Sequence, residues 1–342
     1  MSGALDLNTM WFFLVGALFA GYAILDGFDL GVGALHLFTR GDEHRRILIN
    51  AIAPIWDGNE VWLVAGGGAL FAAFPNVYAT AFSGFYIAFM LLLFCLIFRA
   101  VSIEFRSKQP MAWWRTFWDI SFSVSSLLAA LLIGVALGNI ARGIPLDSEG
   151  AFHGSFWSLL HPYALLVGVC TVVLFLMHGS IFLVMKTEGP LQKQILSWTK
   201  PAIIAFIGCY LALTLSTFVT VPHLAKAFFS RPILYLVALI NLLAIINIPR
   251  QMKRGRPLRA FFSSATTMLT LLLLFGVSAY PHLIYSHPLA ANSLTIYNAA
   301  SSTKTLWIML IIAACGLPLV LVYTTSIYWI FRGKVRLDEH SY

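Results

Sequence analysis

Four carboxylates lie inside two strongly apolar stretches near the start of the chain, and they are the residues best suited to chemistry. Asp26 and Asp29 are three residues apart, as are Asp57 and Glu60, so each pair would share one face of a helix. A carboxylate within a membrane-spanning helix costs about 2.5–3.5 kcal/mol on insertion scales and usually faces a bundle interior or water. Four of them in one helical hairpin predict a proton-binding site or relay.

The expected depth of the acids supports this interpretation. The hairpin loop is centred near residues 42–43, and Asp29 and Asp57 lie at almost equal distances along the chain on either side of it. If both helices are continuous, the other two acids form a second level about one turn further away. Two stacked levels favour a proton function. The alternative is that the acids are neutral or paired groups that only fix helix packing.

Three neighbours on the second helix could support such a site. Pro54 has no amide hydrogen, which frees the carbonyl of Asn50 and favours a kink or a bound water one turn before Asp57. Asn59 could hydrogen-bond a carboxylate or act as a neutral relay, and Trp56 could pack against a partner and hold the backbone. We therefore expect proton movement to depend most on Asp57.

The composition indicates which elements must position these residues. The chain has 342 residues, of which 59% are hydrophobic and only 11% charged, whereas soluble domains carry about 25% charged residues. Apolar stretches of ~20 residues recur, the length that crosses ~30 Å of hydrocarbon as a helix. They are continuous rather than alternating, which favours helices over barrel strands. The sequence predicts an all-α integral membrane protein forming one membrane domain.

Nine segments are long enough to span the membrane, and Pro75 and Asn76 supply the turn that divides the second from the third. Their approximate bounds are 9–38, 47–74, 77–99, 117–138, 160–185, 201–221, 232–249, 260–282 and 304–331. Of the 22 Lys and Arg residues, 18 fall on one side of this arrangement. The positive-inside rule then predicts a periplasmic N-terminus and a cytoplasmic C-terminus. Because the net charge of +8 is spread over short loops, no nucleic-acid partner is expected.

The remaining polar residues in or near the spans have simpler interpretations. Arg99 and Glu104 flank the inner end of the third span and are expected to be interfacial anchors. Asp119, near the start of the fourth, is interpreted as a helix cap or anchor. His178 is the one histidine deep within a span, and it fits a hydrogen-bonded core residue better than a haem ligand. No catalytic residue or metal-ligand spacing is visible.

Several blocks of this sequence resemble the signature blocks of cytochrome bd-type quinol oxidase subunit II. The main ones are LDGFDLGVG at 25–33, IAPIWDGNEVWLVAGGGALFAAF at 52–74 and FRAVSIEFR at 98–106, with shorter ones at 134–139, 186–189, 293–299 and 331–334. The resemblance covers essentially the whole chain. The short connection between the sixth and seventh spans is similar to that of the cyanide-insensitive branch.

The resemblance implies nine transmembrane helices, arranged as two four-helix bundles plus one peripheral helix, in the bacterial inner membrane. It implies a heterodimer with subunit I, which carries haems b and d and oxidises quinol while oxygen is reduced to water. This chain would then ligate no haem iron. It would support subunit I and contribute to a proton pathway and the proton motive force, with a small single-helix subunit and membrane lipid as further partners.

The residues alone leave a second class open, a stand-alone proton-coupled secondary transporter. Such proteins often carry broken helices at matched positions of two halves. The second half of this chain has no cluster equivalent to the acids around Pro54, which favours the oxidase subunit.

Overall fold

The computed structural model describes residues 6–337, and this part of the chain is almost entirely helical. The α-helices are α1 (Leu7–Leu35), α2 (Asp42–Ile52), α3 (Trp56–Ala73), α4 (Pro75–Gly84), α5 (Tyr86–Phe105), α6 (Ala112–Arg142), α7 (Pro162–Lys186), α8 (Gly189–Thr220), α9 (Pro222–Ser230), α10 (Ile233–Lys253), α11 (Pro257–Ala279) and α12 (Thr303–Ile330). Four 3₁₀ turns accompany them: His36–Phe38, Arg106–Lys108, Phe156–Leu159 and Ala290–Asn292. A short antiparallel pair joins β1 (His282–Ile284) to β2 (Leu294–Thr295).

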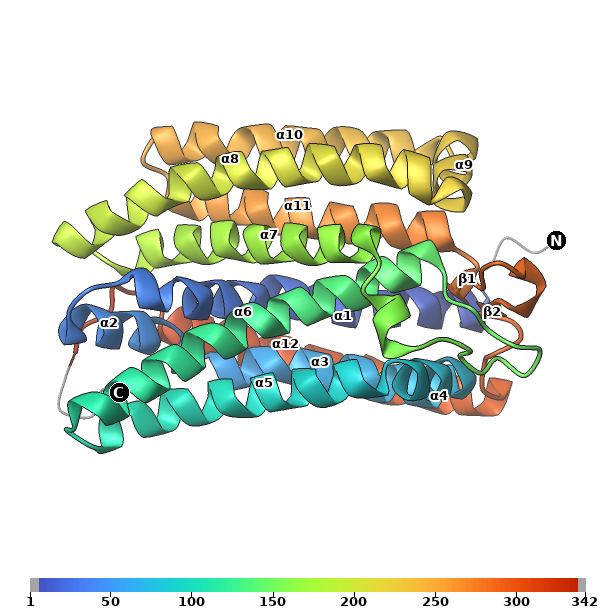
Figure 1. The fold of residues 1–342 in the computed structure, drawn as a ribbon, viewed down its shortest axis with the longest axis horizontal. Coiled ribbons are helices and arrows are strands. Elements are labelled where there is room, and N and C mark those ends of the chain that lie inside the picture. The colour runs from blue at the N-terminus through green and yellow to red at the C-terminus, as the bar shows by residue number, and fades with distance from the viewer. Residues whose placement is uncertain (1–5, 338–342) are drawn as a thin grey trace.

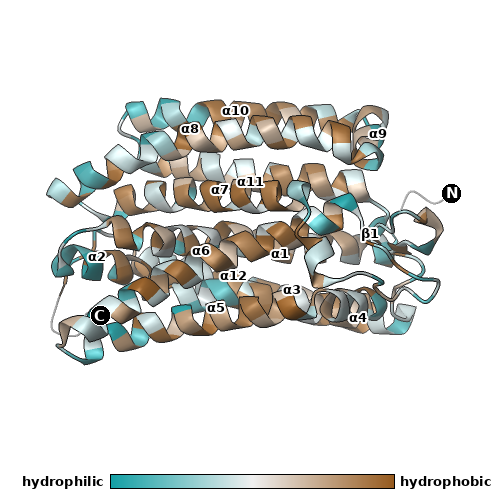
Figure 2. Cartoon of the chain, in the orientation of Figure 1, coloured by the Kyte–Doolittle hydropathy of each residue, from teal (hydrophilic) through white to brown (hydrophobic). Residues whose placement is uncertain are grey.

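Within the described residues, eight helices are long and apolar enough to cross a membrane: α1, α5, α6, α7, α8, α10, α11 and α12. They lie side by side along the long axis of the molecule (Figure 1). Apolar residues dominate their middle portions, and hydrophilic residues gather at the two ends of the bundle (Figure 2). The prediction of an all-helical membrane protein is confirmed.

The predicted span 47–74 is not one continuous helix. α2 ends at Ile52, α3 begins at Trp56, and Pro54 lies in the turn between them. Because proline offers no backbone N–H, the ladder of hydrogen bonds stops there. The equal depth predicted for Asp29 and Asp57 required both helices to be continuous, and the second is not. The next segment is also divided, with α4 and α5 meeting at Phe85.

The helices form layers around α1. α1 packs against α3, α6, α7 and α11, and α12 packs against α3. α8 and α10 lie on the far side of α7 and α11, opposite α3, α5 and α12 (Figure 1). The part of α1 from Asp26 to Leu35 is buried without interruption, so the acids of α1 face protein on all sides.

A glycine pair allows α1 and α7 to cross at close range. A Cβ atom added to Gly31 would lie 1.9 Å from the carbonyl oxygen of Phe175, and one added to Gly179 would lie 2.7 Å from the backbone of Gly31. Small residues at a crossing let two membrane helices approach until their backbones touch. This contact fixes the depth of Asp26 and Asp29, which lie within five residues of Gly31 on the same helix.

Candidate proton site

The first element of the site is an ion pair between Asp26 of α1 and Arg99 of α5. Both side chains are completely buried. The Arg99 Nη1 atom donates to Asp26 Oδ2 at 2.8 Å, and Nη2 donates to Oδ1. The guanidinium also lies 5.9 Å from the centroid of the Trp56 ring. Such two-point arginine–carboxylate pairs are the strong, geometrically specific ones.

The expectation that Arg99 is an interfacial anchor is wrong. α5 continues to Phe105, so Arg99 lies more than one turn inside the helix, where Asp26 supplies its counter-charge. Arg99 is therefore not one of the basic loop residues from which the positive-inside rule infers orientation. Glu104 is partly buried near the inner end of α5, a position compatible with the predicted anchor.

The second element is a chain of hydrogen bonds through three helices. Asn59 of α3 donates from Nδ2 to Asp29 Oδ2 at 2.7 Å. The hydroxyl of Tyr328, on α12, donates to Asn59 Oδ1 at 2.8 Å. Asp29 and Asn59 are 0% and 1% exposed. The sequence predicted that Asn59 could bind a carboxylate, but nothing in it pointed to Tyr328, which lies 269 positions further along the chain.

Asp29 differs from Asp26 in having a neutral partner. Its Oδ2 accepts from an amide, while its Oδ1 is buried without a hydrogen-bond partner among the described residues. The charges of Asp26, Arg99 and Glu60 all act on it. A buried carboxylate that lacks a direct counter-ion is costly as an anion, so Asp29 is the member of the cluster best placed to take up a proton.

Asp57 lies elsewhere. It is exposed on the surface of α3, within the first turn of that helix, and Glu60 is only partly buried. Asp57 does not contact Asp29, because the break at 53–55 starts α3 in a new register and gives Asp29 the partner Asn59 instead. Asp57 is exposed, Glu60 is partly buried, and Asp26 and Asp29 are fully buried, so the acids form a sequence from the surface inward rather than two level pairs.

A small crevice opens beside this sequence, between α3 and α12. Pro54, Gly58 and Asn59 line it on one side, and Tyr323 and Tyr328 line it on the other. The helix break that contains Pro54 therefore adjoins the crevice, and Asn59 connects the crevice to Asp29.

His178 occupies a separate buried position between α1, α7 and α11. Its Nε2 lies 3.1 Å from the carbonyl oxygen of Ile24, and its Nδ1 lies 2.9 Å from Ser264 Oγ. The carbonyl can only accept, so Nε2 carries the hydrogen and Nδ1 accepts from the Ser264 hydroxyl. With both ring nitrogens engaged and Phe261 stacked on the ring at 4.4 Å, His178 does not fit a haem ligand.

No group of three or more His, Cys, Asp or Glu side chains that could hold a metal ion occurs among residues 6–337. In this part of the chain, the residues present offer neither a metal centre nor, at His178, an axial haem position.

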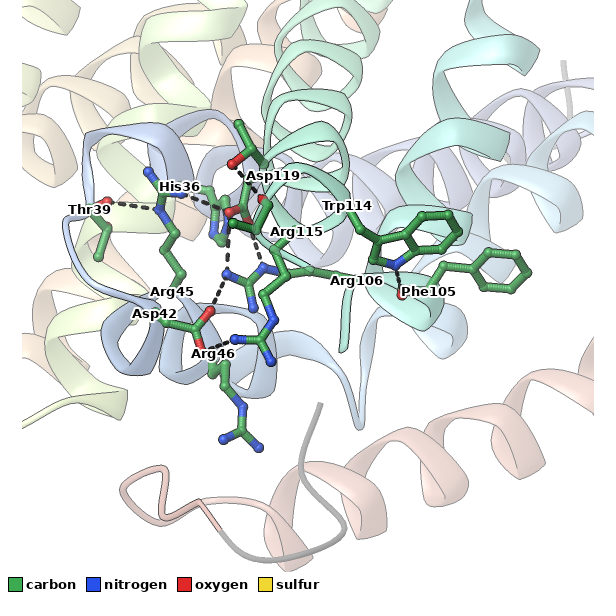
Figure 3. A network of polar contacts seen from close by, with 12 residues as sticks. His36, Thr39, Asp42, Arg45, Arg46, Phe105, Arg106, Trp114, Arg115 and Asp119 are labelled. Atoms are coloured by element: carbon green, nitrogen blue, oxygen red, sulfur yellow. Dashed lines mark hydrogen bonds and ion pairs between the residues drawn. The ribbon is translucent and has the colours of Figure 1, made fainter. Parts of the chain in front are cut away.

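A second polar network ties the loops together at the end of the bundle that carries α2 (Figure 3). Asp119 is 1% exposed and accepts from His36 Nε2 at 2.6 Å, Arg45 Nη1 at 2.7 Å and Arg106 Nε at 2.5 Å. Arg106 also binds Asp42 at 2.9 Å. The interpretation of Asp119 as a cap or anchor is wrong, because α6 begins at Ala112, two turns earlier. The network joins α1, α2, α5 and α6 into one unit.

Comparison with known proteins gives concordant results. The chain matches the family model described as cytochrome bd terminal oxidase subunit II over residues 7–331. It is 35% identical to cytochrome bd-I ubiquinol oxidase subunit 2 of Escherichia coli K12, with 97% of this chain and 96% of the relative covered. It is also 35% identical to cytochrome bd ubiquinol oxidase subunit 2 of Bacillus subtilis, with 98% of each covered.

The fold itself is similar to a chain in the structure of bd oxidase from Geobacillus thermodenitrificans. The TM-score is 0.79 at 17% sequence identity, and the match covers 95% of this chain and 98% of that one. At this low identity the likeness concerns the fold alone.

Proposed function

This chain belongs to the cytochrome bd terminal oxidase subunit II family, and from that premise we propose that its acid cluster forms part of the proton pathway of the oxidase. As subunit II of a cytochrome bd ubiquinol oxidase, it is a multi-pass protein of a bacterial membrane and works within a complex that includes subunit I. The chain is therefore an oxidase subunit and not a stand-alone transporter.

One observation carries the proposal: Asp29 is buried at a helix crossing, with a neutral amide as partner and one carboxylate oxygen free. Reduction of oxygen consumes protons at a site away from bulk water, so an acid that can bind and release a proton within the bundle has a use there. Asp26 lies beside it and is held by two hydrogen bonds from Arg99. Asp57 and Glu60 would connect this pair to the surface of α3.

The exposed position of Asp57 supports a partner at this face. An acid exposed to hydrocarbon at this depth would cost about 2.5–3.5 kcal/mol, so we propose that subunit I covers the Asp57 surface of α3, with the neighbouring Trp56 in the contact. The haems b and d would then lie in subunit I, where quinol is oxidised, and the bonded ring of His178 agrees with that division of roles.

The same family membership supports nine membrane crossings, with α2 and α3 as one broken crossing in addition to the eight long helices. The described chain starts and finishes at opposite ends of the bundle (Figure 1), as an odd number of crossings requires. The basic residues favour a periplasmic N-terminus and a cytoplasmic C-terminus. The network around Asp119 would then face the cytoplasm, and the β1–β2 pair the periplasm.

The variant that tests the proton role is Asp57→Asn, which keeps the shape and removes the titratable group. The measurement is quinol-dependent oxygen uptake by the purified complex, normalised to haem content. We expect turnover per haem to fall by about tenfold or more, since positioned proton-transfer groups contribute at least that much. Glu149→Gln, at an exposed loop position, is the control and should leave turnover unchanged.

If Asp57→Asn has the turnover per haem of the wild type, the proposed proton role of the acid cluster is wrong. Loss of haem or of the complex would instead show that the acids only fix helix packing.

A further inference from the structure

The hydrogen-bonded chain from Tyr328 to Asp29 has an unusual chemical property: its middle member can be reversed. Asn59 presents an NH₂ group to Asp29 Oδ2 and its carbonyl oxygen to the Tyr328 hydroxyl. An amide has one donor end and one acceptor end, whereas a hydroxyl can serve as either. One end of this hydrogen-bonded chain is the Asp29 carboxyl group, which can donate only when it is protonated. The other end is the Tyr328 hydroxyl, which can switch between donor and acceptor to match.

Two complete arrangements follow from these valences. When Asp29 is ionised it only accepts, so the Asn59 NH₂ faces it and the Tyr328 O–H donates to the Asn59 carbonyl, as the structure shows. When Asp29 is protonated, its O–H can donate to the Asn59 carbonyl after the amide turns over, and the NH₂ then donates to the Tyr328 oxygen. Neither arrangement leaves an end of the buried amide without a partner.

We propose that Tyr328 is a positioning residue for Asp29, acting through Asn59, so that Asp29 can be held with its hydrogen bonds complete in both of its protonation states. This inference rests on the proposed proton role of the cluster and adds the residue that makes proton exchange at Asp29 reversible. Tyr328 lies 269 positions from Asn59 in the sequence, so its place beside Asn59 comes entirely from the packing of α12 on α3.

The location of the hydroxyl suits this role. Tyr328 lines the crevice between α3 and α12, together with Pro54 and Gly58, so the outer end of the chain adjoins the helix break. Asn59 is 1% exposed, and leaving one end of a buried amide without a partner costs the desolvation of that group. Without the Tyr328 hydroxyl, one end of the amide would be unbonded in either orientation.

The chain offers a matched control. Tyr323 lies on the same helix and lines the same crevice, but it is 59% exposed and its hydroxyl takes no part in the bonds to Asn59. Tyr328→Phe and Tyr323→Phe therefore remove the same atom from two positions of one helix, and only the first removes it from Asn59.

The experiment compares the two variants in the intact complex by infrared difference spectroscopy between high and low pH, with the Asp29 carboxyl band assigned by its loss in Asp29→Asn. In Tyr328→Phe we expect that band to shift and broaden, because the amide no longer has a fixed orientation. Turnover per haem should fall by about fivefold, the change that corresponds to one lost hydrogen bond. Tyr323→Phe should match the wild type in the Asp29 carboxyl band and in turnover per haem.

An unchanged Asp29 band in Tyr328→Phe would overturn the inference. If that variant fails to assemble, Tyr328→3-fluorotyrosine keeps the shape and strengthens the hydroxyl as a donor, and an unmoved carboxyl band would again overturn it. A failure of the proposed function would look different. Asp57→Asn would then have wild-type turnover, while the Asp29 carboxyl band would still shift in Tyr328→Phe. That result would keep the reversible amide but remove the proton pathway.

Discussion

Arg99 donates to both carboxylate oxygens of Asp26, and the two side chains come from helices 73 positions apart in the sequence. Neither is exposed, so each supplies the only full counter-charge in direct contact that the described residues give the other. The pair holds α1 and α5 together and leaves the adjacent Asp29 as the acid without a cation. In the proposed proton pathway, the different roles of Asp26 and Asp29 depend on this contact.

Breaking the Asp26–Arg99 pair from one side should destabilise the complex strongly. Either Asp26→Asn or Arg99→Gln leaves a buried charge without its partner, a change that costs about 3–5 kcal/mol. The double variant removes both charges and should be less destabilised than the sum of the single ones. The check is a double-mutant cycle on the thermal stability of the purified complex, with unfolding monitored by haem absorption. Additive effects would show that the pair contributes no coupling.

The glycine crossing between α1 and α7 gives a test with a built-in control. Gly31→Ala would place a methyl group 1.9 Å from the Phe175 carbonyl oxygen, whereas a Cβ on Gly67 meets nothing within 4 Å. We expect Gly31→Ala to reduce the yield of assembled, haem-containing complex severely and Gly67→Ala to leave it unchanged. Equal yields would mean that α1 and α7 do not pack as closely as described.

One carboxylate outside the bundle predicts a local dependence on pH. Asp147 accepts from the backbone N–H groups of Ala151 and Glu149, and these bonds, the one from Ala151 first, hold the pKa of Asp147 below its usual value. The stabilisation of this turn is therefore present above the unfolded pKa of about 3.9 and is lost as the pH falls through the lower folded value.

Hydrogen exchange at the Ala151 amide checks this expectation. Protection should be constant near neutral pH and should decrease in acid, once the intrinsic pH dependence of exchange is removed. In Asp147→Asn the amide should exchange faster near neutral pH, without the additional decrease in acid. A wild-type profile in that variant would contradict the assignment.

The orientation can be tested with reporters of compartment. With the buried Arg99 left out, 17 basic residues remain on one side against four on the other. We therefore expect a cytoplasmic signal from a reporter fused after Tyr342 and a periplasmic signal from one inserted near Glu149. Two signals from the same side would be incompatible with the nine-crossing arrangement.

The sequence was sufficient for the class of protein and for part of the site. The lipid environment requires low charge and repeated apolar segments, so a membrane protein can be recognised from its sequence without a structure. The acids at 26 and 29 were recognisable because a charge inside a span needs an explanation. Asn59, close to them in a predicted hairpin, was a reasonable partner for the same reason.

The remaining contacts depend on packing that no local pattern encodes. Arg99 was expected at an interface because the end of α5 could not be placed to within two turns, and a two-turn error moves a residue from the headgroup region into the core. Tyr328 is one aromatic residue among many in the last span. Asp57 was misplaced for a different reason: Pro54 signalled a kink, but the size of the break decides which face of α3 the next residue occupies.

The interruption between α2 and α3 gives the bundle the free N-terminus of a helix part-way along its length. α3 starts at Trp56, and Asp57 lies in its first turn. Aligned peptide dipoles place about half a positive elementary charge at such an end, and that partial charge acts mainly within the first turn. The backbone itself thus supplies a positive potential at this point of the bundle without a basic side chain. A continuous helix through the same depth would have provided no such potential.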